Sequence, residues 1–148
     1  MKKILLFMLC LTLTVLCGCG AKGNTESKSS KPLTDIVSLD GKYQDTVSRR
    51  ATATVEVTGN NSAIITVVWG SSAYQATIWT MTASLAADGT LGYSNERQYD
   101  LITEEDGSQT EQEEYSGKSG YFKVENKDLL WLGAANKKCR KCRFVKIK

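Results

Sequence analysis

Two cysteines near the C-terminus are the sharpest candidates for chemistry in this sequence. Cys139 and Cys142 enclose Arg140 and Lys141, whose positive charges favour thiolates. In an oxidising compartment such a pair forms a disulfide across a tight turn, whereas thioredoxin-type chemistry needs a helix N-terminus beside a parallel sheet. Zinc needs four ligands, so a zinc site on this pair would require a dimer. We expect a local structural disulfide, with reduced thiols as the alternative.

Catalytic residue types are scarce, because the 148 residues include no histidine. Serine–histidine and cysteine–histidine pairs and histidine-ligated metals are therefore excluded. An enzyme would need paired carboxylates inside one pocket with separated pKa values. The acids available in the predicted framework are Asp45, Glu56, Glu96 and Asp100. Since no nucleophile–base constellation is recognisable, we expect no enzymatic activity, no catalytic residue, no cofactor and no metal.

Large apolar side chains are the candidates for ligand binding. Such side chains commonly line small-ligand cavities, and the same residue types form the core of a small domain, so both readings stay open. We expect the partner to be a small apolar ligand or a surface protein. The residues with a candidate role in lining a cavity are Trp69, Trp79, Met81, Tyr93, Phe122 and Trp131.

The elements that must position these residues are short strands separated by turn residues. Residues 51–57 and 74–85 alternate apolar and polar side chains, which is the period-2 pattern of half-buried strands. Glycine, asparagine and serine between the runs favour tight turns. The eight expected strands are residues 42–47, 51–57, 63–69, 74–85, 91–102, 120–124, 129–133 and 143–147.

The strand expected at residues 91–102 and the acidic segment after it form one predicted hairpin. Alternation places Tyr93 and Tyr99 on one face of this strand, with Asn95 and Arg97 between them. Residues 104–114 hold acids on both sides of a glycine and lack the ligand spacing of a calcium loop. We therefore expect this segment to be a solvated tip that projects from the domain.

Successive antiparallel strands joined by short turns form a meander, and eight of them can close so that no edge remains unpaired. The interior of such a barrel holds side chains or one small ligand. We therefore expect an all-β, eight-stranded antiparallel up-and-down barrel, with an open two-sheet sandwich as the alternative. Gly41-Lys42-Tyr43-Gln44-Asp45 is similar to the glycine-x-aromatic opening of lipocalin-like barrels. Residues 48–53, 68–73 and 78–82 also resemble lipocalin-like domains of small lipoproteins from Gram-positive gut bacteria.

The first 18 residues predict an export signal. Lys2 and Lys3 give a positive start, and residues 4–17 are apolar apart from Thr12 and Thr14. A membrane-spanning helix needs about 20 apolar residues. This run is shorter and is followed by small residues and a polar tract, which favours cleavage over a retained span.

Leu16-Cys17-Gly18-Cys19 resembles the lipobox of bacterial lipoproteins. The resemblance implies that Cys19 receives a diacylglyceryl group and becomes the new N-terminus after cleavage. Two or more acyl chains make a stable anchor, whereas one chain holds only marginally. We therefore expect the protein at the cell membrane, lipid-anchored through Cys19 on the outer, extracytoplasmic face.

The chain divides into three predicted parts. Residues 1–18 form the lipoprotein signal peptide, residues 19–38 the lipidated cysteine and a flexible polar tether, and residues 39–148 the β-barrel domain. The end of the tether, residues 33–39, has enough apolar side chains for a short helical turn or a plug against the domain. Removal of the signal lowers the formal charge from +3 to +1, because two lysines are its only charged residues. This charge gives no general case for nucleic-acid binding.

These features favour a cell-surface protein that binds a small ligand, a surface polymer or a surface protein. The alternatives are an enzyme based on framework carboxylates and a protein inhibitor. The inhibitor alternative comes from Ser116-Gly117-Lys118-Ser119-Gly120-Tyr121, which is similar to the serine-glycine-x-x-tyrosine loop of membrane-bound lysozyme inhibitors, with the tyrosine one position late. The basic residues between Lys137 and Lys148 are expected to face anionic lipids or wall polymers, or to protect a sheet edge from aggregation.

Overall fold

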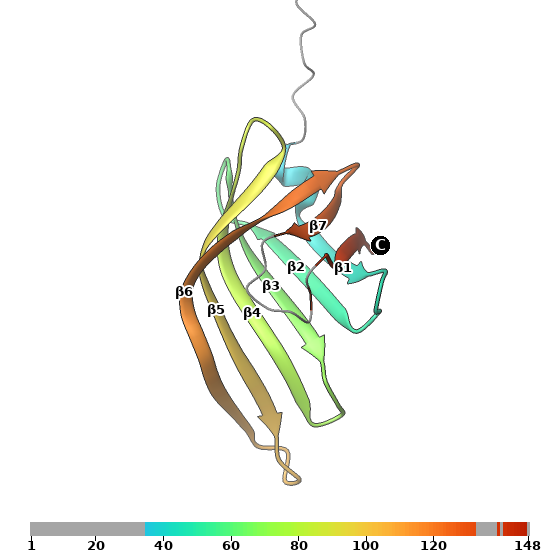
Figure 1. The fold of residues 1–148 in the computed structure, drawn as a ribbon, viewed down its shortest axis with the longest axis vertical. Coiled ribbons are helices and arrows are strands. Elements are labelled where there is room, and N and C mark those ends of the chain that lie inside the picture. Colours follow the sequence, from blue (N-terminus) through green and yellow to red (C-terminus); the bar gives the residue numbers. More distant parts are fainter. Residues whose placement is uncertain (1–34, 133–138, 140, 148) are drawn as a thin grey trace, which may run out of the picture.

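The computed structural model describes residues 35–132, 139 and 141–147, and within this part the chain is an all-β barrel. Eight antiparallel strands follow one another in chain order, and the last pairs with the first, which closes the barrel (Figure 1). The predicted up-and-down barrel is therefore confirmed. No helix among the described residues is long and apolar enough to cross a membrane. The strands are β1 (Gly41–Asp45), β2 (Ala51–Val57), β3 (Ser62–Gly70), β4 (Gln75–Leu85), β5 (Thr90–Thr103), β6 (Gln109–Glu125), β7 (Asp128–Leu132) and β8 (Arg143–Lys146).

Alternating burial along the strands produces the interior. In β2 the side chains of Ala51, Ala53 and Val55 are buried, and the residues between them are not. The register continues this face across the sheet, because Ala53 pairs with Val67 of β3 and Val67 pairs with Trp79 of β4. A register slip of one residue would turn all of these side chains outward, so the apolar pattern fixes the pairing.

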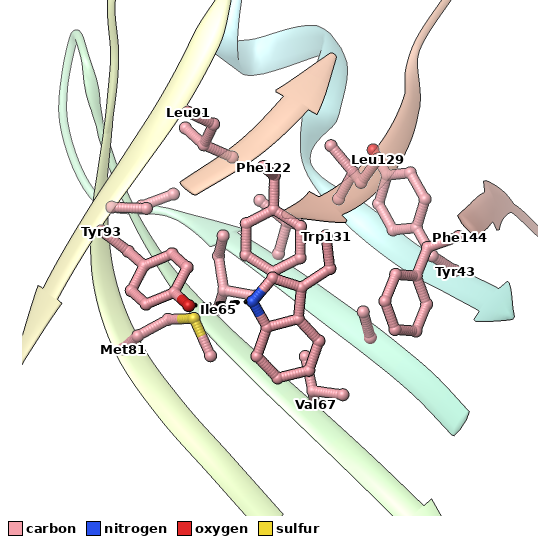
Figure 2. Packing of buried hydrophobic residues seen from close by; sticks show 14 of the residues in the cluster. Tyr43, Ile65, Val67, Met81, Leu91, Tyr93, Phe122, Leu129, Trp131 and Phe144 are labelled. Carbon is pink, nitrogen blue, oxygen red and sulfur yellow. Dashed lines mark hydrogen bonds between the residues drawn. The ribbon is translucent and has the colours of Figure 1, made fainter. Parts of the chain in front are cut away.

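The centre of the barrel is a cluster of aromatic side chains (Figure 2). The Trp131 ring is stacked on Phe122 with centroids 5.4 Å apart and meets Trp79 edge-on at 5.5 Å. Its indole nitrogen donates a 2.9 Å hydrogen bond to the Tyr93 hydroxyl. All four side chains are almost fully buried. Trp131 therefore joins β4, β5 and β6 through contacts made inside the barrel.

A short 3-10 helix, η1 (Ile36–Leu39), covers one end of the barrel. Its Ile36 and Leu39 side chains are buried in the core, and the Leu39 carbonyl accepts a 2.6 Å hydrogen bond from the Tyr43 hydroxyl. The expected apolar plug is thus formed by Ile36–Leu39. The described fold consequently includes Asp35–Ser38, which the sequence-based division assigned to the tether.

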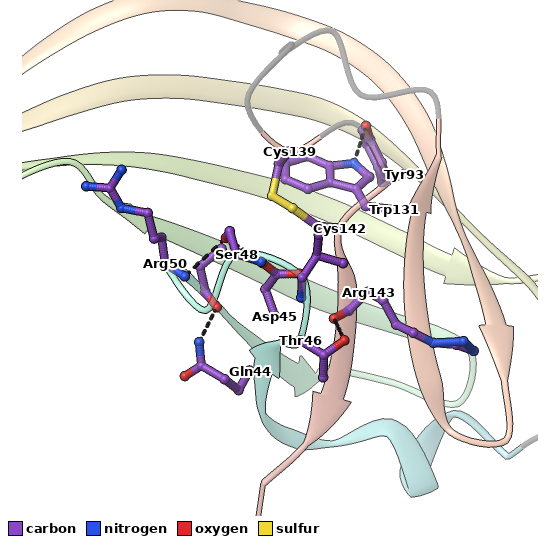
Figure 3. The surroundings of a disulfide bond; sticks show 12 residues. Gln44, Asp45, Thr46, Ser48, Arg50, Tyr93, Trp131, Cys139, Cys142 and Arg143 are labelled. Atoms are coloured by element: carbon purple, nitrogen blue, oxygen red, sulfur yellow. Dashed lines mark hydrogen bonds between the residues drawn. A yellow bond between two sulfur atoms is a disulfide. The ribbon is translucent and has the colours of Figure 1, made fainter.

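A disulfide between Cys139 and Cys142 lies at the other end, next to the turn between β1 and β2 (Figure 3). Both cysteines are buried in the core cluster, with Cα atoms 5.1 Å apart. The backbone amide of Trp131 donates to the Cys142 carbonyl, and the Lys141 amide donates to the Trp131 carbonyl. The disulfide turn is therefore tied directly to the tryptophan at the centre of the core.

Strands β5 and β6 are far longer than β1, β7 and β8, and they extend beyond the closed part of the barrel (Figure 1). The prediction that residues 104–114 are all hairpin tip is wrong, because only residues 104–108 form the turn and β6 already begins at Gln109. Arg97 on β5 pairs with Glu111 and Glu113, so the acidic residues are held in a regular ladder. Where β5 and β6 extend beyond the barrel, neither face of the two-stranded sheet packs against a core. The alternation of apolar and polar residues that identifies a strand is therefore absent from this part of the sequence.

The prediction that Tyr93 and Tyr99 share a face is also wrong. The register shifts between Tyr93 and Glu96, where Asn95 adopts a φ of 54°. A β-bulge adds one residue to a strand and therefore reverses the faces that follow it. As a result, Tyr93 points into the core, whereas Tyr99 lies on the outer face with the Arg97 guanidinium 4.4 Å from its ring centroid.

The close approach of Gly120 to Tyr93 gives a test of the core packing. A Cβ added at Gly120 would lie 2.5 Å from Tyr93 Cζ, while a Cβ added at Gly92 would meet no heavy atom within 4 Å. We predict that Gly120→Ala lowers the free energy of unfolding by about 1–3 kcal/mol, as overpacked core variants do. The matched control Gly92→Ala should change it by less than about 0.5 kcal/mol. Urea denaturation measures both, and equal effects would contradict this packing.

The disulfide gives a second test. For a loop as short as residues 139–142, loop-closure entropy predicts that the double variant Cys139→Ala/Cys142→Ala loses about 2 kcal/mol of unfolding free energy. In the oxidised chain from residue 19 onward, carrying Cys19→Ala, an alkylating reagent should modify neither cysteine until a reductant is added. Intact mass spectrometry reads this directly, and two alkylated thiols without reductant would rule out the disulfide.

Candidate functional site

A group of polar side chains faces inward next to the aromatic core, and we call it the polar inner face. Its position follows from the register, because Gln98 pairs with Trp79 of β4 and with Tyr115 of β6. Asp100 is next along the same face of β5 and pairs with Thr77, which is buried. The polar inner face consists of Thr77, Glu96, Gln98, Asp100 and Tyr115.

Glu96 is the deepest member of the polar inner face and is fully buried. One of its carboxylate oxygens accepts a short hydrogen bond from the Tyr115 hydroxyl. The other oxygen, Oε2, has no hydrogen-bond partner among the described residues. Buried polar atoms nearly always have a partner, so an unpartnered buried carboxylate oxygen is unusual and lowers stability.

The tyrosines beside Glu96 are held in their neutral form. Burial raises the pKa of both Tyr93 and Tyr115, and the Glu96 carboxylate raises both pKa values further. A neutral phenol O–H can donate a hydrogen bond, and the Tyr115 hydroxyl donates one to the Glu96 carboxylate. Both hydroxyls are therefore neutral near pH 7, where Tyr115 donates to Glu96 and Tyr93 accepts from the Trp131 indole.

Hydrogen bonds also fix the remaining members of the polar inner face. The Trp79 indole nitrogen donates to Gln98 Oε1 at 3.0 Å, and the Thr77 hydroxyl donates to Asp100 Oδ1 at 2.7 Å. The Gln75 amide donates to Asp100 Oδ2 at 3.2 Å. Because Gln98 and Asp100 are only half-buried, they present an ordered polar surface toward solvent above the core.

Lys118 covers the Tyr115 ring. Its ammonium nitrogen lies 3.6 Å from the ring centroid, within the range of a cation–π interaction. Lys118 pairs with Glu96 across the two strands, and a bulge at Gly117, where φ is 79°, carries the chain from Tyr115 to Lys118. The lysine side chain itself is exposed. The order from solvent inward is therefore Lys118, Tyr115, Glu96.

The four framework acids do not converge on one site. Asp45 accepts hydrogen bonds from the amides of Val47 and Ser48 and from the Ser48 hydroxyl, at 2.6 to 3.2 Å. Burial acts to raise the pKa of Asp45, but these hydrogen bonds outweigh burial and hold it below its ordinary value. Asp45 thus orders the turn after β1, while Glu56 is exposed on β2. Only Glu96 and Asp100 share a face.

Glu96 and Asp100 are well separated along β5. Four residues along a strand separate their backbones by about 13 Å, and the carboxyl groups of glycosidases lie within about 10 Å of each other. Asp100 is occupied by Thr77 and Gln75. Among the described residues no group of three or more metal-ligating side chains is placed to hold an ion.

The structure brings together five of the six residues predicted to line a cavity. They lie in one core cluster, in which the aromatic rings contact one another (Figure 2). Trp69 is half-buried against that cluster and pairs with Thr77, so it borders the polar inner face. The five clustered residues are Trp79, Met81, Tyr93, Phe122 and Trp131.

Other predicted features fall in different places. Residues 116–121, compared above with an inhibitor loop, are part of strand β6 and do not form a loop. In the basic C-terminal segment, Arg143 pairs with Glu125 and Asp128, and the Lys146 ammonium donates to the Ser38 carbonyl. The lipobox with Cys19, tether residues 20–34, and basic residues 137, 138, 140 and 148 lie outside the described residues.

Sequence reasoning named Glu96 only as a framework acid and missed Tyr115 and Lys118. The one available signal was the combination of Asn95 and Gly117, since both residue types tolerate positive φ and mark bulges in strands. Comparisons with protein-family models, with curated proteins and with solved structures found no match. The chemistry of the polar inner face therefore has to be inferred from this chain alone.

Proposed function

We propose that this protein is a lipid-anchored binding protein on the outer face of the cell membrane, and that it binds a small ligand at the polar inner face. The anchor is proposed from the lipobox-like residues that end in Cys19. A dozen polar residues after it, followed by one folded domain, suit a binding module that works close to the membrane.

The observation that carries the binding proposal is the ordered polar surface directly above a filled aromatic core. Binding sites combine apolar and aromatic walls with a few fixed polar groups. Here Trp69 and Tyr115 supply half-buried aromatic surface, and Gln98 and Asp100 supply polar groups that protein hydrogen bonds already orient. The buried Glu96 adds an acceptor oxygen without a protein partner. This preorganisation lowers the entropic cost of binding.

An enzymatic function has less support. The acids are separated or engaged, and the neighbouring tyrosines are held neutral by burial and by Glu96. No base is positioned against a nucleophile in the polar inner face. We therefore propose binding without catalysis, and with no cofactor.

The anchor is tested by two cysteine variants. We predict that the full chain expressed in bacteria incorporates labelled palmitate and sediments with membranes, and that Cys19→Ala abolishes both. Cys17→Ala is the matched control, because this cysteine lies in the expected signal and should leave both properties unchanged. Persistent labelling of Cys19→Ala, or its loss in Cys17→Ala, would contradict acylation at Cys19.

The binding face is tested by chemical-shift mapping. The probe is a set of small sugars, amines, alcohols and carboxylic acids, added to the chain from residue 19 onward with Cys19→Ala. We predict saturable amide shifts centred on Gln98, Asp100 and Tyr115, which Gln98→Leu reduces at least about tenfold in affinity through loss of oriented hydrogen bonds. Glu56→Gln, on exposed β2 surface, is the control. Shifts confined to other surfaces, or none, would overturn the proposal.

A further inference from the structure

The contact between Lys118 and Tyr115 shows what chemistry the outer part of the polar inner face accepts. A primary ammonium group already sits over the Tyr115 ring at 3.6 Å from its centroid. Such a contact holds an exposed cation only weakly, so the flexible lysine can leave it. The ring is half-buried and fixed through its hydroxyl, whereas Lys118 is exposed. The Tyr115 ring is therefore held in place by its hydrogen bond, whereas the contact of the exposed Lys118 ammonium is weak.

Glu96 makes this ring a stronger receptor for a cation. The Tyr115 hydroxyl donates to the Glu96 carboxylate, and hydrogen bonds in a network polarise one another. Donation to a carboxylate increases electron density on the phenol, which strengthens its attraction for a positive charge. A neutral partner for Tyr115 would not have this effect.

Glu96 has no direct ion-pair partner among the described residues, and the Lys118 ammonium reaches it only through the Tyr115 ring. No lysine or arginine in the described part of the chain forms an ion pair with Glu96, and its Oε2 atom has no hydrogen-bond partner there. Buried carboxylates are ordinarily paired or fully hydrogen-bonded. A ligand ammonium on the outer side of Tyr115 would take the place of the Lys118 charge.

We infer that the Tyr115 ring, backed by Glu96, is the binding site for an ammonium group of the ligand, and that Lys118 occupies this site in the free protein. The inference rests on the proposed function and specifies the ligand class as an organic amine. A neutral sugar or alcohol would use the aromatic surface but would not replace the positive charge of Lys118. An ammonium ligand replaces the lysine with a group of the same charge and shape.

The test compares n-butylammonium chloride with 1-butanol, which has similar shape and no charge. Shifts of the Tyr115 amide and the Trp79 indole N–H report binding to the chain from residue 19 onward with Cys19→Ala. We expect saturable shifts with butylammonium and none with 1-butanol. Lys118→Met should bind butylammonium about 2- to 5-fold more tightly, since the competing contact of an exposed cation is lost.

Variants separate the local site from general electrostatics. Lys123→Met removes the same charge from the same strand, away from Tyr115, and should leave the affinity unchanged. Glu96→Gln should weaken butylammonium binding about tenfold or more, the loss expected when a cation loses its charged partner. Tyr115→Leu removes the ring at a half-exposed position and should abolish binding, which provides a test independent of whether Glu96→Gln folds.

The outcomes distinguish this inference from the proposed function. Equal shifts with butylammonium and 1-butanol, or weaker binding by Lys118→Met, would overturn the ammonium site. If another class in the probe set still binds the polar inner face, the proposed binding function survives and only the ligand class is wrong. If neither butylammonium nor any other probe binds there, both proposals fail.

Discussion

The packing of Trp131 is the interaction on which the rest of this barrel depends. Its ring stacks on Phe122 and meets Trp79 edge-on, and its indole nitrogen is bonded to Tyr93. Its backbone amide and carbonyl are both bonded to the disulfide turn. A fully buried aromatic side chain contributes several kcal/mol to a small domain. One residue thus fills the interior, fixes the tyrosine next to Glu96 and ties down the end of the barrel.

The second constraint is the series of three register shifts between β5 and β6, two of which position the residues around Glu96. The bulge at Asn95 reverses the faces of β5, so that Arg97 and Tyr99 point outward and Glu96 points inward. The bulge at Gly117 lets Tyr115 lie opposite Gln98 while Lys118 lies opposite Glu96. Bulges re-aim side chains without interrupting the sheet. The aromatic core and the polar inner face therefore belong to the same strands. The bulges between them change which alternate residues of each strand face inward.

The fold was predictable from the sequence and parts of the hairpin were not. Strand β2 and most of β4 alternate buried and more exposed side chains, and turns with glycine and asparagine separate the strands, so the strand order followed from local patterns. In β6 the acids Glu111 and Glu113 occur where both faces are solvated, and their role becomes visible only when Arg97 is placed beside them. Likewise, a single asparagine reads as an ordinary polar position until its positive φ is known. Glu96 and Tyr115 are 19 residues apart in sequence, and only the folded register joins them.

The energetics of Glu96 are the reason why we propose ligand binding near this residue. A buried carboxylate with one unpartnered oxygen lowers stability, and well-packed apolar residues of similar volume commonly do better at such positions. The surrounding core supplies apolar packing of this kind, so Glu96 is not needed to complete the barrel. The Tyr115 hydroxyl offsets part of this cost, and an added donor to Oε2 would offset more of it. Unlike Asp45, whose carboxylate is satisfied by the turn it orders, Glu96 keeps an acceptor available. The difference between these two buried acids is the physical basis for placing ligand binding at the polar inner face.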